Sequence, residues 1–169
     1  MSLTTVRNLI VSKLYAKTAK PVIQMEQTAS KPPLPYIAYK IITAGNTEPG
    51  QPIMERTEVV STDPLFDYDI KETATEQEQE TFSFCAYADT SVASMELATV
   101  AKNFIKHNMY YDLKDAGAVV VDVAAEGDRT VLIDPAYEFR YGFDVIIRMV
   151  NSAERIVSTI EEININLED

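Results

Sequence analysis

The side chains best suited to chemistry are scarce in this chain, and their spacing forms no catalytic or metal-binding motif. His107 is the only histidine and Cys85 the only cysteine among the 169 residues. One of each cannot supply the ligand spacing of a zinc site. A thiolate–imidazole pair between them is left open, but no signature of a cysteine nucleophile surrounds Cys85. We expect His107 to lie near a helix C-terminus, where a cation suits the helix dipole, and Cys85 to be a buried strand residue.

Motifs for nucleotide and calcium binding are also missing. A dinucleotide loop or P-loop needs closely spaced glycines, and the five glycines here stand far apart, at Gly45, Gly50, Gly117, Gly127 and Gly142. Asp63, Asp67 and Asp69 suggest the start of a calcium loop, but the required glycine and closing glutamate are not at loop spacing. No carboxylate pair stands out among the 26 acids. The sequence therefore predicts no catalytic, cofactor-binding or metal-binding residue and no enzymatic activity.

Three charged residues share one face of a C-terminal strand pattern. Apolar and aromatic residues alternate with Arg140, Asp144 and Arg148 over residues 134–150, which predicts a strand with one apolar and one charged face. Neighbours four apart on a strand are separated by about 13 Å, so they cannot bond one another. They either pair across strands, with Glu161 or another neighbour, or bind carboxylates of a second subunit.

Negative charge dominates the composition and concentrates in one segment. The formal net charge is −11, so the chain is a poor candidate for binding nucleic acid through its backbone phosphates. Residues 63–80 form a mobile surface loop or the outer half of a long hairpin that leads into the strand pattern at 81–88. This segment holds our acidic loop candidates, Asp67, Asp69, Glu72, Glu76, Glu78 and Glu80. With no signal-peptide core and no membrane-spanning apolar run, we expect a soluble intracellular protein.

Periodicity predicts the elements that would position these residues. Helical spacing indicates helices at about 3–17 and 91–107, the second capped by Asp89 or Ser91, with a short helical turn at 108–114. Residues 43–52 contain glycines and prolines and predict a loop. A buried-type strand is expected at 117–125, and a turn at 151–154 is expected to join two strands into a hairpin. Further strands are expected at 22–27, 36–42, 56–62, 81–88 and 130–133. The predicted class is α+β: a single domain over 1–169, with one mostly antiparallel sheet, two main helices on one face and a long C-terminal β-hairpin.

Four pieces of sequence in this order resemble a known family. They are residues 33–40, the Phe82-Ser-Phe84 strand followed by an Ala/Leu-rich helix, residues 113–121, and residues 137–144, which lead towards Thr159–Ile163. The last piece is the most specific. Together they cover most of residues 1–167 and resemble tail terminator proteins, also called neck or tail-completion proteins, of tailed phages or phage tail-like particles.

This resemblance implies a structural role without catalytic residues or cofactors. Such proteins are expected to form homohexameric rings that cap the tail tube, stop its polymerisation and offer a surface to the head–tail connector. The implied partners are other copies, the tail tube protein and the connector, while DNA passes through the lumen of the ring without specific binding. The acidic candidates of residues 67–80 would line this lumen. The implied location is the host cytoplasm during assembly and then the virion tail. Candidate subunit or tube contacts are Tyr36, Tyr39, Tyr137, Arg140, Asp144 and Arg148.

Two other readings of the sequence stay open. A head–tail joining or head-completion protein would act on the portal side of the same assembly. A small α+β enzyme or ligand-binding module would gather polar side chains around a concave apolar pocket.

Overall fold

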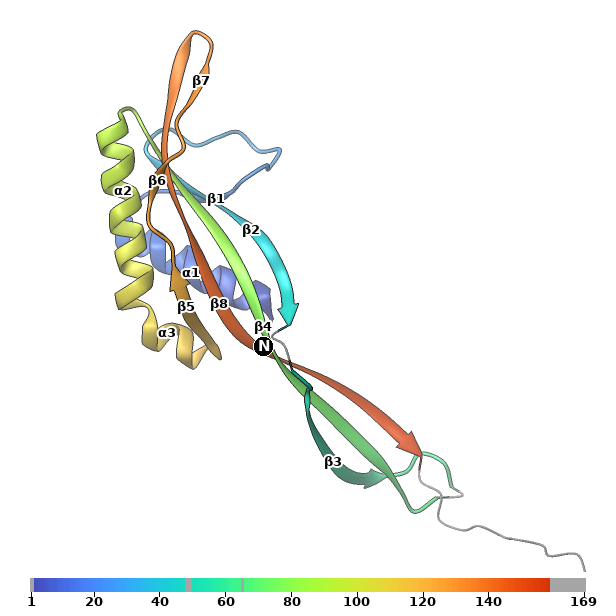
Figure 1. The fold of residues 1–169 in the computed structure, drawn as a ribbon. Helices are drawn as coiled ribbons and strands as arrows, with labels where there is room; N and C mark the ends of the chain where they lie inside the picture. The colour runs from blue at the N-terminus through green and yellow to red at the C-terminus, as the bar shows by residue number, and fades with distance from the viewer. Residues whose placement is uncertain (1, 48–49, 65, 159–169) are drawn as a thin grey trace, which may run out of the picture. The chain divides into compact units, whose positions relative to one another are not determined.

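The computed structural model describes residues 2–47, 50–64 and 66–158, which are drawn in colour in Figure 1. The chain divides into two compact units: unit 1 comprises Met1–Glu48 and Gln77–Val150, and unit 2 comprises Pro49–Glu76 and Asn151–Asp169. The helices are α1 (Leu3–Thr18), α2 (Ser91–Asn103), the π-helical turn η1 (Phe104–Asn108) and α3 (Tyr110–Asp115). The strands are β1 (Val22–Gln24), β2 (Tyr36–Thr47), β3 (Ile53–Val60), β4 (Tyr68–Ala88), β5 (Ala118–Val123), β6 (Gly127–Asp128), β7 (Val131–Ile133) and β8 (Ala136–Ser158). Within the described ranges no helix is long and apolar enough to cross a membrane.

Unit 1 is built on a mostly antiparallel sheet with the strand order β1-β2-β4-β8-β5. β2 runs antiparallel to β4, with Tyr39 opposite Phe84. β5 runs antiparallel to β8, while the short β1 is parallel to β2. β6 and β7 pair with the first part of β8. The α+β class with a mostly antiparallel sheet, predicted from the sequence, is confirmed.

The two main helices begin at side-chain caps. The Ser2 hydroxyl accepts the Thr5 backbone N–H at 3.3 Å, and the Thr90 hydroxyl accepts the Ala93 N–H at 3.2 Å. Each cap satisfies a donor that the first helical turn leaves unpaired. Helix α1 ends at Ala19, which has a left-handed φ of 52°. The cap of α2 is therefore Thr90, and the prediction of Asp89 or Ser91 was wrong.

A wide helical turn follows α2. Four buried residues, Ala101, Ile105, Met109 and Leu113, recur every fourth position, whereas an α-helix turns every 3.6 residues. The Met109 N–H bonds to the Phe104 carbonyl, five residues back, at 3.2 Å. This π-type turn widens the helix, so the drift of a four-residue spacing is absorbed and all four side chains stay in the core.

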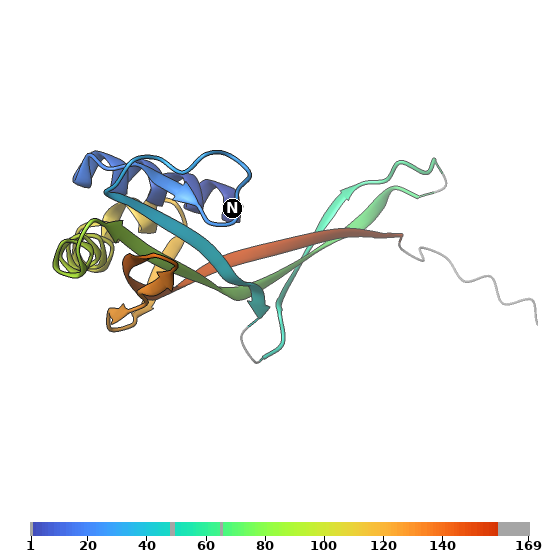
Figure 2. The same cartoon turned by 90° about the horizontal axis from the view of Figure 1, so that it is seen from above.

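The core of unit 1 lies between the helices and one face of the sheet (Figure 2). α1 contributes Val6, Ile10 and Leu14, and the region of α2 and η1 contributes Ala98, Ala101 and Ile105. Alternate residues of the strands meet them, namely Ile37, Tyr39, Phe82, Phe84, Ala86, Phe143, Val145 and Ile147. The predicted placement of both helices on one face, and the predicted apolar face of β8, are confirmed.

The described part of unit 2 consists of strands and contains no helix. β3 pairs antiparallel with the first part of β4, from Ile53 opposite Thr75 to Val60 opposite Tyr68. The last part of β8 also belongs to this unit, where Arg155 contacts Glu72 and the hydroxyls of Ser152 and Thr75 lie 3.3 Å apart. Residues 68–80 of the acidic segment thus lie in β4, whose first part pairs with β3.

Three local predictions were wrong. β8 is one continuous strand through residue 158, so no turn closes a hairpin at 151–154; residues 159–166 lie outside the described ranges. The segment 151–154 contains neither glycine nor proline, and β4 is long enough to partner β8 beyond it. β2 extends through Thr47 into the expected loop. β5 is largely exposed, because it lies at the end of the strand order and covers the core with one face only.

Candidate functional site

Arg129 organises a polar cluster on the sheet face opposite the helices. Ser83 on β4 donates a 2.6 Å hydrogen bond to the Asp144 carboxylate on β8. The Arg129 guanidinium, on the link between β6 and β7, donates to Ser83 Oγ at 2.7 Å and to Asp144 Oδ1 at 3.0 Å. Its Nη1 also lies 3.6 Å from Cys85 Sγ. One arginine therefore ties together side chains from two strands, which fixes the link above the sheet.

Gly142 makes room for this arginine. It lies on β8 between Arg140 and Asp144 and pairs with Gly127 across the ladder. A Cβ at Gly142 would come within 2.7 Å of the Phe84 carbonyl oxygen and 2.8 Å of Arg129 Cδ. Only a residue without a side chain lets the guanidinium stem lie this close to the strand.

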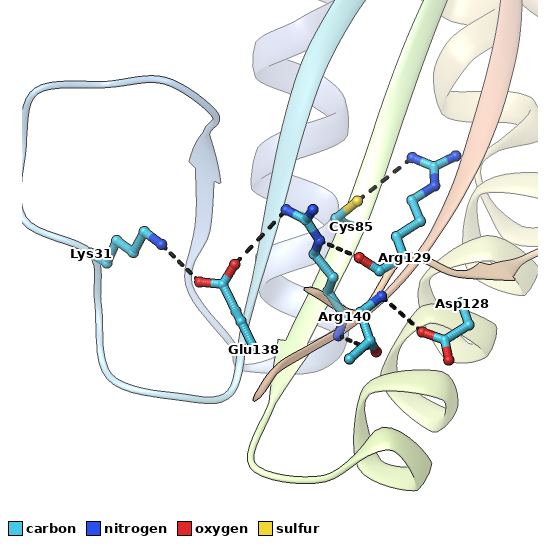
Figure 3. Close-up of polar contacts among 7 residues, drawn as sticks. Lys31, Cys85, Asp128, Arg129, Glu138 and Arg140 are labelled. Atoms are coloured by element: carbon cyan, nitrogen blue, oxygen red, sulfur yellow. Dashed lines mark hydrogen bonds and ion pairs between the residues drawn. The ribbon is translucent and has the colours of Figure 1, made fainter. Parts of the chain in front are cut away.

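A second cluster continues along the same face (Figure 3). Arg140 Nε donates to the Arg129 carbonyl, and Arg140 Nη1 lies 3.8 Å from Glu138 Oε2. Lys31 Nζ, from the segment between β1 and β2, donates to Glu138 Oε1 at 2.8 Å. The Thr130 backbone N–H donates to Asp128 Oδ1 at 2.8 Å, which closes the link that carries Arg129.

The pKa values show that these charges are satisfied within the chain. Burial would raise the pKa of Asp144, but hydrogen bonds from Ser83 and Arg129 outweigh it and hold the value below the usual 3.8. The hydrogen bond to Glu138 raises the pKa of Lys31 above its ordinary 10.5. Groups held in their charged forms are poorly suited to proton transfer near neutral pH.

The three predicted aromatic contacts lie in different surroundings. Tyr39 is 6% exposed in the core, and its ring centroid lies 6.3 Å from that of Phe84. Tyr36 is buried on the opposite face and stacks on Tyr87 with a centroid distance of 4.7 Å. Tyr137 is 61% exposed. Of the three, Tyr137 presents its ring to solvent.

The predicted charged face is assembled mostly by cross-strand contacts. Arg140 and Asp144 both contact Arg129 but not each other, as their strand spacing requires. Arg148 is half-buried on the same strand. Sequence reasoning missed Arg129 and Ser83, although a glycine at 142 inside an alternating strand signals a close approach.

The predicted acidic residues divide between the two units. In unit 2, Glu72 is 7% exposed in its side chain and bonds to Arg56 at 2.8 Å and to Arg155 at 2.6 Å. Hydrogen bonds from Arg155 and then from Arg56 lower its pKa. Asp69 is buried and Asp67 exposed, while Glu76 is half-buried. In unit 1, Glu78 is half-buried, and Glu80 is buried and accepts the Gly45 N–H at 3.0 Å.

The described surface offers little that could do chemistry. His107 is exposed on η1 and Cys85 is buried on β4, so these two side chains sit on separate elements. Among residues 2–47, 50–64 and 66–158, no group of three metal-ligating side chains is close enough to hold an ion. An open groove of about 330 Å³ lies beside Tyr137 and is lined by Lys31, Pro32, Leu34, Tyr36, Ala88, Asp89, Tyr137, Glu138 and Phe139. Of its three charged members, Lys31 and Glu138 pair with each other, and the third is Asp89.

Comparison with known families identifies the chain. A family model described as phage neck terminator protein matches residues 3–169. No curated protein matches the sequence. The match covers nearly the whole chain, both units included, and agrees with the resemblance drawn from the sequence. The chain therefore belongs to the phage neck terminator family, whose members are structural, non-enzymatic proteins of the phage tail.

Proposed function

We propose that this protein caps the tail tube at the neck as a homohexameric ring, stops tube polymerisation and presents a surface to the head–tail connector. The observation that carries the proposal is the family match over residues 3–169. The internal pairing of Asp144, Glu138 and Glu72 supports it, since these charges serve the fold. Both units then act as one functional domain over residues 1–169, made in the host cytoplasm and retained in the virion tail.

The tube-capping role has a direct test. Purified tube protein is allowed to polymerise with and without this chain, and tube lengths are measured by negative-stain electron microscopy. Capping predicts a narrow, shorter length distribution with a ring at one end. Unchanged tube lengths at several-fold molar excess of the chain would refute capping.

Loss of the gene separates the two structural readings. Overlong or headless tails after deletion support a terminator. Normal tails beside filled heads that leak DNA would point instead to a head-completion protein.

We further propose that Tyr137 and the charged face of Arg140, Asp144 and Arg148 contact the tube, the connector or a neighbouring subunit. The exposed Tyr137 ring borders the open groove, and a tyrosine can bury its ring and still hydrogen-bond at an interface rim. Tyr137→Ser should therefore weaken capping several-fold. Tyr15→Ser removes a similarly exposed ring from α1 and is the matched control. Equal capping by both variants would remove Tyr137 from the interface.

The acidic residues of 67–80 are proposed to repel DNA from the lumen, so that the genome slides through without binding. Asp69, Glu72 and Glu80 are buried, so the variant that tests this changes Asp67, Glu76 and Glu78 to their amides. Slower DNA ejection or retained DNA is expected. Ejection at the normal rate and salt dependence would count against this role.

A further inference from the structure

The tip of the β7–β8 hairpin in unit 1 exposes apolar side chains on both of its faces. β7 pairs with the first residues of β8, and Figure 1 shows this hairpin projecting beyond the end of α2. Leu132 lies opposite Tyr137 on one face, and Ile133 occupies the other face. Each of these three residues is more than half exposed. Apolar residues that cluster in this way, rather than standing singly, indicate a surface that contacts another protein.

The tip also carries one unpaired negative charge. Asp134 lies in the turn between the two strands, is exposed, and has no ion-pair partner among the described residues. The other acid of the hairpin, Glu138, is already paired with Lys31 at 2.8 Å. No lysine or arginine stands between residues 130 and 139. Asp134 is therefore the charge that the tip offers to a partner.

A groove elsewhere in unit 1 has the complementary character. It has a volume of about 340 Å³ and lies between the end of α1 and the first turns of α2. Four residues give it an apolar lining, namely Pro35, Ala93, Leu97 and Val100. The rest of the lining is polar or charged: Lys17, Thr18, Lys20 and Glu96.

The two lysines of this groove are available to a partner. Within the described ranges neither Lys17 nor Lys20 has a carboxylate partner. By contrast, Lys13, one turn earlier on α1, pairs with Asp112 at 2.7 Å. The single acid of the groove, Glu96, comes from α2. An acidic partner is therefore favoured at the α1 side of the groove, where the lysines lie.

The tip and the groove match in shape class and in charge. Because both faces of the tip are apolar, insertion between two helices would cover Leu132 and Ile133 together. The same placement brings Asp134 to the unpaired lysines. The two surfaces are different parts of one chain, so each copy can give a tip to one neighbour and receive a tip from the other. A head-to-tail contact of this kind closes into a ring when its rotation fits.

We propose that the β7–β8 tip of one copy inserts into the α1–α2 groove of the next copy, with Leu132 and Ile133 against its apolar lining and Asp134 beside Lys17 and Lys20. The inference rests on the proposed ring. It adds the two surfaces through which the subunits would join.

Charge reversal on each surface, followed by mixing, tests this contact. Asp134→Lys and the double variant Lys17→Glu with Lys20→Glu each set like charges against each other. Each should raise the concentration at which half of the chain is multimeric, measured by light scattering, by about tenfold or more. In an equal mixture of the two variants, each chain meets the opposite charge on both neighbours. The mixture should therefore assemble at the wild-type concentration. This rescue also shows that both variants are folded.

Two matched controls separate the contact from general effects of charge and polarity. Asp122→Lys changes an exposed acid on β5 by the same charge and should leave assembly unchanged. Leu132→Ser with Ile133→Ser should weaken assembly, because it removes the apolar part of the tip. Tyr111→Ser, which replaces an exposed ring on α3, should not.

The possible failures are distinguishable. Rings that form at the wild-type concentration in every variant would overturn the docking and leave the ring intact. The same holds if the two charge variants fail to assemble both alone and when mixed. If rings form only on tubes, capped tube ends are counted in the same comparison. A wild-type chain that stays monomeric in solution and at tube ends would overturn the ring itself, and this inference with it.

Discussion

Adding one methyl group at Gly142 should destabilise unit 1 while the same change across the ladder does not. In Gly142→Ala the new Cβ would stand 2.7 Å from the Phe84 carbonyl oxygen, a backbone atom held in the β2–β4–β8 ladder. Ordinary contact begins near 3.5 Å, so the strands must separate by about 0.8 Å or bend. Overpacking of this kind costs about 1–3 kcal/mol. For a chain of this size that lowers Tm by about 2–12 °C.

The control is Gly127→Ala. Gly127 pairs directly with Gly142, but a Cβ there meets no atom within 4 Å. This substitution should be neutral or stabilise by about 0.4–1 kcal/mol through the unfolded chain. Thermal unfolding followed by circular dichroism compares the two variants. Equal Tm values for Gly142→Ala and Gly127→Ala would refute the close approach of the Phe84 carbonyl and of Arg129 to Gly142.

Three further predictions concern charges and caps. Asp144→Asn should make the free energy of unfolding depend less on pH in acid. A carboxylate whose pKa is lowered in the folded protein stabilises the fold fully above the usual 3.8 and loses that contribution as pH falls through the lowered value. Denaturant unfolding between about pH 5 and pH 2 would reveal the difference. Glu72→Gln should speed hydrogen exchange along β3, because Arg56 and Arg155 lose the carboxylate that they share. Glu76→Gln, which lies on β4 as Glu72 does, should leave this exchange unchanged. Thr90→Ala should cost about 0.5–2 kcal/mol in chemical denaturation, as expected for a lost N-cap, and no change in stability would show that the Ala93 N–H does not depend on it.

Local periodicity predicted the elements whose burial follows from their own sequence. Helix α1 was recognisable because Val6, Ile10 and Leu14 recur at one helical face, and these residues are in the core. The register of β8 was also correct, with Phe143 and Val145 facing the helices. In both cases the side chains that decide the outcome lie within a few positions of one another.

Features set by distant parts of the chain were the ones missed. The partners of Arg129, Ser83 and Asp144, come from strands 46 and 15 residues away, and no local pattern announces them. The apolar run of β5 suggested a strand covered on both faces, yet β5 lies at the end of the strand order. The turn at 151–154 was placed between two alternating runs, but the length of the strand there depends on whether β4 offers a partner.

The π turn after α2 has a consequence for how this protein can change length. The Met109 N–H bonds to the Phe104 carbonyl five residues back, where a regular α-helix bonds four residues back. Deleting one residue between them would let the same pair close as an ordinary α-helical bond, so Met109 and Leu113 should keep their place in the buried column. The same deletion in the regular turns of α2 would rotate everything beyond it by about 100° around the axis, so the π turn is where this helix should best tolerate the loss of a residue.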